Sequence, residues 1–406
     1  MIIPVQEIRS HFPALWRTHN GHEVAYFDGP GGTQVPHAVI DAMTDYLLNH
    51  NANTHWAFPT SAETDEIVAN SRQALADFLN ASPDEIAFGQ NMTSLTFHLS
   101  RALGGRFAEG DEIICTELDH HANIDPWRFL AKERGLNINF ISFDTESGTL
   151  NLDELQGLIT DRTKLLAIGA ASNALGTISD VKKACAIARD ARVLSFVDAV
   201  HYAPHELVDV RDFGCDFLAC SAYKFYGPHI GILFGRNELL NSIDFPKLRP
   251  APDAAPDRVE TGTQSHESIA GAAAAVDFLA SLSEDGDSRR ERLASAFREL
   301  HARQSDLVRR LWDGLSAIGG VRIFGPNPEM PRTSTVSFTI DGVDSETVSR
   351  RLAEDGLFAS NGDFYASTVV ERLGLPETGL LRIGCCIYTT QDEIDRLVEA
   401  VVRIAG

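Results

Sequence analysis

Short apolar runs alternate with segments whose apolar residues recur at helical spacing over much of the chain. The apolar runs predict buried strands at 86–88, 111–116, 164–171, 193–198, 215–220 and 230–235. The helical spacing predicts helices at 35–48, 64–79, 95–103 and 180–191. This alternation is typical of an α/β fold with a mostly parallel sheet covered by helices on both faces. In such sheets ligands bind beyond the carboxyl ends of the strands, where we expect the functional site.

The pattern changes after residue 235. A connector rich in proline and alanine at 247–256 precedes a long helical pattern, which glycine, serine and acidic residues interrupt at 281–287. The strands expected after it, at 321–324, 335–340 and 380–386, predict a small α+β domain. A chain of 406 residues is long enough for two domains. We expect an N-terminal segment that packs with the small domain (1–20), a large domain (21–282) and the small domain (283–406).

Composition narrows the class of protein. The formal charge of −22 argues against a nucleic-acid or anionic-membrane partner, because both depend on basic surfaces. No apolar run reaches the ~18 residues of a membrane span, and the first residues lack the pattern of a signal peptide. The six cysteines include neither a CxxC pair nor a Cys/His zinc spacing, so we predict no metal. We expect a soluble, cytoplasmic protein.

Lys224 lies between two apolar runs, in the stretch 221–228 (SAYKFYGP). A lysine at the end of a strand is usually a solvated charge. Here two tyrosines flank it and a second apolar run follows, so we expect a crowded pocket. Loss of water lowers the pKa of a lysine amine and makes it a nucleophile toward a carbonyl. Lys224 is therefore the predicted catalytic residue.

Asp198 ends the apolar run before that of Lys224. Pyridoxal phosphate (PLP) acts as an electron sink only while its ring nitrogen is protonated, and a buried aspartate beside that nitrogen keeps it so. Asp198 is therefore the candidate partner for the ring nitrogen of a PLP held by Lys224.

The segment 89–94 (GQNMTS) joins a strand to a helix. Exposed N–H groups at a helix N-terminus attract phosphate, which favours an anion site here. The alternative is an ordinary helix cap formed by Thr93 or Ser94.

Histidines and an arginine supply the remaining candidates. His120 and His121 follow the strand at 111–116, and adjacent residues in an extended chain point in opposite directions, so only one faces the pocket. A metal pair is disfavoured because no third ligand lies near them in the sequence. Arg382 lies among apolar neighbours, where it either pairs with an internal Asp or Glu or binds a substrate carboxylate.

Four motifs in this order carry a resemblance: ELDHHAN at 117–123, SNALGT at 172–177, VDAVHYAPH at 197–205 and SAYKFYGP at 221–228. With them the chain resembles the class V aminotransferase family, and most of all its cysteine desulfurase-like, PLP-dependent branch. The resemblance runs from Tyr26 to Arg382. It implies the PLP-dependent transferase fold (aspartate aminotransferase-like, fold type I), with a mostly parallel, seven-stranded type of large sheet and a small α+β C-terminal domain.

The resemblance also implies roles for single residues. Lys224 would hold PLP, Asp198 its ring nitrogen and Asn173 its 3′-oxygen, His121 would stack on the ring, and Arg382 would bind the substrate's α-carboxylate. The other residues expected to contact the cofactor are Asn91, Met92, Thr93, His201, Ser221 and Tyr223. Thr263 matches a segment that reaches the phosphate of the neighbouring subunit, so we expect a homodimer.

Some residues depart from the family pattern. Desulfurases carry a mobile cysteine in a loop of the second domain, and here Tyr365 stands where that cysteine is expected. Cys385 and Cys386 lie on a strand and are poor substitutes for it. His201 replaces a glutamine, and Tyr223 replaces a histidine before the catalytic lysine.

These residues predict an enzyme that acts on a small amino acid. We favour C–S bond cleavage by β-elimination, as in a cysteine or cystine lyase or a desulfurase-like enzyme. Transamination or epimerisation would use the same residues. A non-catalytic scaffold is disfavoured, because a scaffold needs none of Lys224, Asp198, Asn173 and Arg382.

Overall fold

A seven-stranded sheet forms the centre of the molecule. The computed structural model describes residues 2–376 and 378–406. The strands of the large sheet are β4 (Ile86–Gly89), β10 (Gly231–Gly235), β9 (Phe217–Ser221), β8 (Leu194–Asp198), β7 (Thr163–Gly169), β5 (Glu112–Thr116) and β6 (Asn137–Ile141), in this spatial order. The strands from β9 to β6 are parallel, whereas β10 runs antiparallel to both β9 and β4. The predicted mostly parallel large sheet is confirmed.

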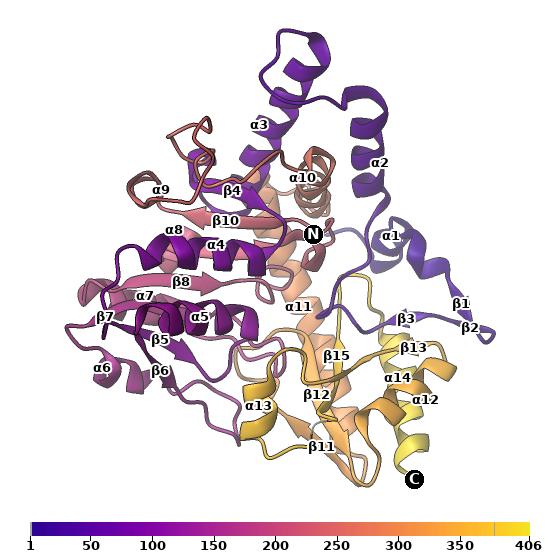
Figure 1. Cartoon of the computed structure of the whole chain (residues 1–406). Coiled ribbons are helices and arrows are strands. Elements are labelled where there is room, and N and C mark those ends of the chain that lie inside the picture. Colours follow the sequence, from indigo (N-terminus) through magenta and orange to yellow (C-terminus); the bar gives the residue numbers. More distant parts are fainter. Residues whose placement is uncertain (1, 377) are drawn as a thin grey trace.

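Helices cover both faces of this sheet (Figure 1). Along β7, Leu166 and Ile168 enter one core with α3 (Pro59–Leu79), α7 (Val181–Asp190) and α10 (His266–Ser281). Leu165 and Ala167 enter the other core with α4 (Met92–Gly104) and α5 (Asp125–Arg134). Successive side chains of a strand point to opposite faces, so a strand buried on both sides is apolar throughout. This explains why the sequence shows continuous apolar runs.

A second, four-stranded sheet belongs to the C-terminal part. Its strands are β11 (Val321–Phe324), β12 (Thr335–Ile340), β15 (Leu380–Gly384) and β14 (Ser360–Gly362). Strands β11, β12 and β15 share a core with α11 (Arg289–Ser316), α12 (Ser345–Glu354) and α14 (Gln391–Ala405). The expected small α+β unit is therefore present. The break expected at 281–287 falls between the end of α10 and the start of α11.

The N-terminal segment contacts both parts of the molecule. The ring of Phe12 lies 5.5 Å from that of Phe278 on α10 and 5.0 Å from that of Tyr388, which precedes α14. The other described strands are β1 (Thr18–His19), β2 (His22–Glu23), β3 (Ala25–Tyr26) and β13 (Leu357–Phe358), and β3 pairs with β13. The other described α-helices are α1 (Val5–Ser10), α2 (His37–Asp45), α6 (Leu155–Leu158), α8 (Val210–Phe213), α9 (Asn237–Ser242) and α13 (Ser367–Arg372). None of the described helices is both long and apolar enough to cross a bilayer.

Two helix starts differ from the sequence-based expectation. Helix α3 begins at Pro59 rather than near residue 64, because proline is well suited to the first helical position. Helix α4 begins at Met92, and its cap is Asn91, whose side chain accepts a hydrogen bond of 2.9 Å from the N–H of Ser94. A cap at Thr93 or Ser94 was therefore the wrong alternative. The first turn of α4 lies closer to the end of β4 than expected.

The backbone of Asn91 lies against Gly231 at the start of β10. A Cβ atom on Gly231 would lie 2.4 Å from the carbonyl carbon of Asn91 and 2.7 Å from its Cα. Only glycine permits so close an approach between two backbones. The position of the α4 N-terminus therefore depends on this glycine.

We expect Gly231→Ala to lower the free energy of unfolding by about 1–3 kcal/mol, because the backbone of Asn91 must move to admit the methyl group. Gly157→Ala is the control, since a Cβ there meets nothing within 4 Å. Urea unfolding followed by circular dichroism measures both variants. A Gly231→Ala protein as stable as the wild type would contradict the close approach.

Candidate active site

A cavity of about 1030 Å³ opens at the carboxyl ends of the parallel strands. Asp198 and Ser221 are the last residues of β8 and β9, and Arg382 reaches the cavity from β15 of the small sheet. Every site residue predicted from the sequence lines this cavity except Thr263. Thr263 is exposed, on the segment before α10. The structure thus brings together side chains from both parts of the chain.

Lys224 ends a short turn that follows β9. Its Nζ donates hydrogen bonds to the carbonyl oxygens of Pro30 (2.5 Å) and Gly31 (3.0 Å). Loss of water inside the cavity lowers the pKa of Lys224 to about 7, and the charge of Arg382 acts in the same direction. A large fraction of this amine is therefore unprotonated at neutral pH, as a nucleophile or base requires.

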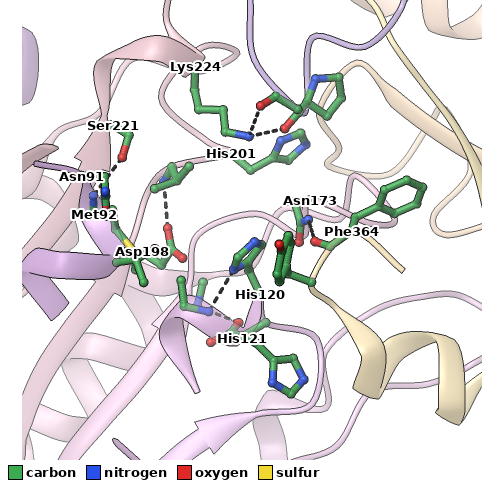
Figure 2. Close-up of a pocket in the computed structure, with 18 of the residues that line it drawn as sticks. Asn91, Met92, His120, His121, Asn173, Asp198, His201, Ser221, Lys224 and Phe364 are labelled. Atoms are coloured by element: carbon green, nitrogen blue, oxygen red, sulfur yellow. Dashed lines mark hydrogen bonds between the residues drawn. The ribbon is translucent and has the colours of Figure 1, made fainter. Parts of the chain in front are cut away.

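Asp198 is buried at the end of β8, and Figure 2 shows it across the cavity from Lys224. Its Oδ1 accepts a hydrogen bond of 2.9 Å from the N–H of Val200. Burial raises its pKa to about 6, although the Val200 N–H and the charge of Lys224 both oppose this. Because no described residue forms an ion pair with it, a cationic group of a ligand would stabilise the carboxylate.

The first turn of α4 forms one wall of the cavity. The N–H of Met92 donates a hydrogen bond of 2.9 Å to the hydroxyl of Ser221, which ties this turn to the end of β9. Thr93 and Tyr223 line the cavity next to this contact. A helix N-terminus and three residues with hydroxyl groups thus line the same cavity, which suits a phosphate.

The structure corrects the choice between the two histidines. Figure 2 shows His120 pointing into the cavity, where its ring lies 5.5 Å from that of Tyr365. His121 instead points away, and its ring nitrogens contact Asp125 (3.1 Å) and Ser367 (2.9 Å). The expectation that His121 presents its ring to the cofactor is therefore wrong for this structure.

The reason lies in the turn that precedes the histidines. Strand β5 ends at Thr116, and a 3₁₀ turn begins at His121, so alternation cannot be counted from the strand. Burial lowers the pKa of His120 to about 4, with the charge of Lys224 acting in the same direction. A neutral aromatic ring therefore lies in the middle of the cavity.

Arg382 is buried on β15 without a carboxylate partner among the described residues. Its Nη1 donates a 2.9 Å hydrogen bond to the carbonyl of Asn173, its guanidinium lies 3.9 Å from the ring centre of Phe364, and its Nε has no partner. The internal salt bridge considered above was thus the wrong alternative. Burial lowers the pKa of Arg382 to about 9. A buried guanidinium with a free donor favours a carboxylate ligand.

Asn173 and His201 complete the wall between Asp198 and Arg382. Asn173 donates a 2.9 Å hydrogen bond to the carbonyl of Phe364, while its buried Oδ1 has no partner. His201 is buried and contacts Thr333 and Thr335 through Nε2. Both side chains thus keep polar atoms that a ligand can satisfy.

Sequence reasoning missed Asp119, which also lines the cavity. Its Oδ1 accepts hydrogen bonds from the Thr116 hydroxyl (2.8 Å) and the Gly169 N–H (2.9 Å), and its Oδ2 accepts one from Asn123 (2.7 Å). Burial raises its pKa to about 7. These bonds fix the turn that carries His120, and the motif at 117–123 contained the only signal for this role.

The lysine, the buried aspartate and the unpaired arginine in one cavity of this fold define a PLP-dependent enzyme. The cofactor fits observations made on this chain: a Lys224 amine whose pKa burial lowers to about 7, an orphaned Oδ1 on Asn173, and a helix N-terminus held close by Gly231. Comparison with known proteins agrees. The model of the aminotransferase class-V family matches residues 25–397, and the chain belongs to that family.

Similar curated proteins are cysteine desulfurases. A probable cysteine desulfurase 2 from Mycobacterium leprae is 33% identical, over 99% of this chain and 96% of its own length. A cysteine desulfurase from Pectobacterium carotovorum is 31% identical, over 100% of this chain and 98% of its own. Among solved structures, a cysteine desulfurase from Thermococcus onnurineus matches with a TM-score of 0.89 and 28% identity, covering 100% of this chain and 98% of its own. The resemblance to the PLP-dependent branch is thereby confirmed.

The pKa of Lys224 predicts how the apoprotein takes up its cofactor. Only the unprotonated amine attacks the PLP aldehyde, so the uptake rate should rise with pH through a midpoint near 7. A lysine with the ordinary pKa of 10.5 would give a rate that still rises far above neutral pH. The measurement is PLP retained after borohydride reduction and denaturation. Lys224→Ala should retain none, whereas Lys182→Ala, at an exposed lysine paired with Asp212, should behave as wild type. Retention on Lys224→Ala would contradict the assignment.

Proposed function

We propose that this chain cleaves the C–S bond of a small sulfur-containing amino acid by β-elimination. The observation that carries the proposal is a PLP cavity with an unpaired Arg382 beside Lys224, lined by no cysteine among the described residues. Its curated relatives are named as cysteine desulfurases, which supports cysteine as the substrate. For cysteine and water, the balanced products are sulfide, pyruvate and ammonia.

The residues that would hold the cofactor are Lys224, Asp198, Asn173, His201, His120, Ser221, Tyr223 and the first turn of α4 at Asn91, Met92 and Thr93. When bound, PLP supplies an electron sink that stabilises negative charge at the substrate's α-carbon. Asp198 would hold the proton on the ring nitrogen, and the flat, neutral ring of His120 suits stacking on the pyridine.

Two residues act on the substrate itself. Arg382 would bind the α-carboxylate through its free donors, and the Phe364 ring against its guanidinium limits how the side chain can turn. Lys224 Nζ, with a pKa of about 7, would take the proton from the α-carbon. Arg382 would thus orient the substrate, and Lys224 would activate it by removing the proton. The departing sulfur then needs either a thiol of the protein or release to solvent.

Release of free sulfide is favoured because the thiols of this chain are unsuited to receive sulfur. All six cysteines are buried, and burial raises the pKa of Cys386 to about 12 and that of Cys385 further. A thiol with such a pKa is not a nucleophile at neutral pH. Tyr365, expected at the position of the desulfurase cysteine, lies at the cavity rim and is 75% exposed.

We also propose that the enzyme is a cytoplasmic homodimer in which Thr263 reaches the partner's phosphate. Large apolar side chains are exposed around α2 and the start of α3, namely Ile40, Leu47, Leu48, Trp56 and Phe58. In Figure 1 these helices extend away from the large sheet, so this surface is free to meet a second copy. Glu260, paired with Arg72 at 2.7 Å, fixes the start of the segment that carries Thr263.

The route of the sulfur can be tested directly. Purified holoenzyme given cysteine without a thiol acceptor should release sulfide and pyruvate in equal amounts, and mass spectrometry should find no persulfide on the protein. Cys385→Ala and Cys386→Ala should each keep activity within about threefold, because neither thiol takes part. Lys224→Ala is the inactive control. Alanine as product, together with a persulfide on the chain, would contradict elimination and favour a desulfurase route.

The dimer has its own test. Light scattering should give about twice the chain mass of 44.4 kDa. Leu48→Asp should shift the protein toward the monomer, because it places a charge in the proposed apolar interface. Val402→Asp, at an exposed apolar position on α14, should leave the mass unchanged. Thr263→Ala should keep the dimer and weaken PLP binding. A wild-type monomer that binds PLP tightly would contradict this proposal.

A further inference from the structure

The side chain of His121 has no role in the proposed chemistry, yet it joins the two parts of the chain. His121 follows β5 of the large sheet, whereas the residues that it contacts belong to the small α+β unit, at and just before the start of α13. Its Nε2 lies 2.9 Å from the hydroxyl oxygen of Ser367 and 3.3 Å from that of Thr368. Its backbone N–H donates a 2.7 Å hydrogen bond to the carbonyl of Tyr365. One residue of the large unit thus holds three residues of the small unit.

Asp125 fixes the ring of His121 from the opposite side. Its Oδ2 lies 3.1 Å from Nδ1 of the histidine. A carboxylate oxygen accepts hydrogen bonds, so Nδ1 carries a hydrogen and rotation of the ring is limited. Nε2 faces two hydroxyl groups, each of which can donate or accept, so its contacts persist in either charge state of the ring.

The loop held in this way carries the ring that covers Arg382. Phe364 and Tyr365 have left-handed φ angles of 57° and 56°, which persist only where other contacts hold them. Asn173 donates a 2.9 Å hydrogen bond to the carbonyl of Phe364, and His121 donates to the carbonyl of the next residue. The centre of the Phe364 ring lies 3.9 Å from the guanidinium carbon of Arg382. The position of this ring therefore depends on two anchors in the large unit.

A ring over one face of the guanidinium leaves its edge for a ligand. Nη1 of Arg382 donates to the carbonyl of Asn173, whereas Nε has no partner among the described residues. A carboxylate binds a guanidinium best in the plane of its N–H groups, through two parallel hydrogen bonds. Ordering a mobile side chain on binding costs affinity, so a guanidinium that is fixed in advance binds a carboxylate more tightly.

We propose that His121 is a positioning residue for the substrate. It anchors the loop of the small unit to the large unit, so that the Phe364 ring holds the Arg382 guanidinium with its free edge open to a carboxylate. Asp125 keeps the ring of His121 in the orientation that this anchor requires. The inference rests on the proposed carboxylate site at Arg382 but not on the fate of the sulfur.

The anchor is tested by amide hydrogen exchange, measured by mass spectrometry on the purified protein without substrate. His121→Ala should raise exchange across residues 363–369 about 3- to 10-fold, because the hydrogen bonds at Nε2 are lost. Ser367→Ala with Thr368→Val removes the same contacts from the other side and should have the same effect. Ser367→Thr keeps a hydroxyl and should match the wild type. Arg128→Ala, which removes an exposed ion pair of α5, is the control and should also match it.

The effect on the ligand site is measured by spectral titration of the holoenzyme. L-Alanine has no sulfur to lose, and L-alaninamide lacks the carboxylate. His121→Ala should bind alanine about 3- to 10-fold more weakly than wild type, because Arg382 is less well fixed, and should bind alaninamide equally well. PLP retained after borohydride reduction should equal that of the wild type. Phe364→Leu should also weaken alanine binding, and the double variant should be no weaker, because both changes act through the same ring.

Equal weakening of alanine and alaninamide, or loss of PLP from His121→Ala, would overturn the proposal in favour of a packing role or a cofactor contact. Unchanged exchange at 363–369, or unchanged alanine binding, would also overturn it. If His121→Ala fails to fold, the Ser367 and Thr368 variants carry the same comparison. Hydrogen exchange requires neither PLP nor sulfur chemistry. A wild-type chain that retains no PLP would therefore refute the proposed function, while exchange still decides whether His121 is the anchor.

Discussion

The active site depends on one electrostatic constraint: three ionisable groups are largely removed from water, and none of them forms a direct ion pair with another described residue. Lys224, Asp198 and Arg382 face one cavity. Burial favours the uncharged form of each side chain and shifts their pKa values to about 7, 6 and 9, respectively. A buried charge without a partner costs several kcal/mol, which the rest of the fold must offset. A cationic ring nitrogen of a ligand would stabilise the Asp198 carboxylate, and an aldehyde on the same ligand would react with the Lys224 amine. The carboxylate of a substrate would pair with Arg382. The cavity is therefore arranged for charges that the ligands bring.

The sequence predicts those features of the site that depend on residues close together in the chain. The strands carrying Asp198 and Lys224 are buried on both faces, so their apolar runs stand out and their carboxyl ends can be located. The cap at Asn91 and the orientation of His120 depend on turns only a few residues long, where the direction of a side chain is set by backbone dihedrals that periodicity does not report. That Arg382 forms no ion pair with a described residue depends on which distant segments come near it. No pattern within β15 contains that information.

The loop that carries Phe364 and Tyr365 at the rim of the cavity shows how a departure from the family motif changes the site. Phe364 and Tyr365 both have left-handed backbone conformations, with φ of 57° and 56°. Such conformations cost of order 1–3 kcal/mol each and persist only where other contacts hold them. Here the His121 N–H donates to the Tyr365 carbonyl at 2.7 Å, Asn173 donates to the Phe364 carbonyl, and the Phe364 ring lies on Arg382. A loop held by three such contacts is suited to covering Arg382 rather than to carrying a mobile group in and out of the cavity.

These contacts also join the two parts of the chain through the site itself. Arg382 and Phe364 come from the small unit and contact Asn173 of the large one, while Thr333 and Thr335 contact His201 in the same way. A shift of one unit relative to the other would therefore change the contacts of the Arg382 guanidinium and those of the His201 ring together. Binding at either place favours the same relative position of the units, since both sets of hydrogen bonds require it. A ligand held at Arg382 and a ligand held at His201 would thus each favour the binding geometry of the other.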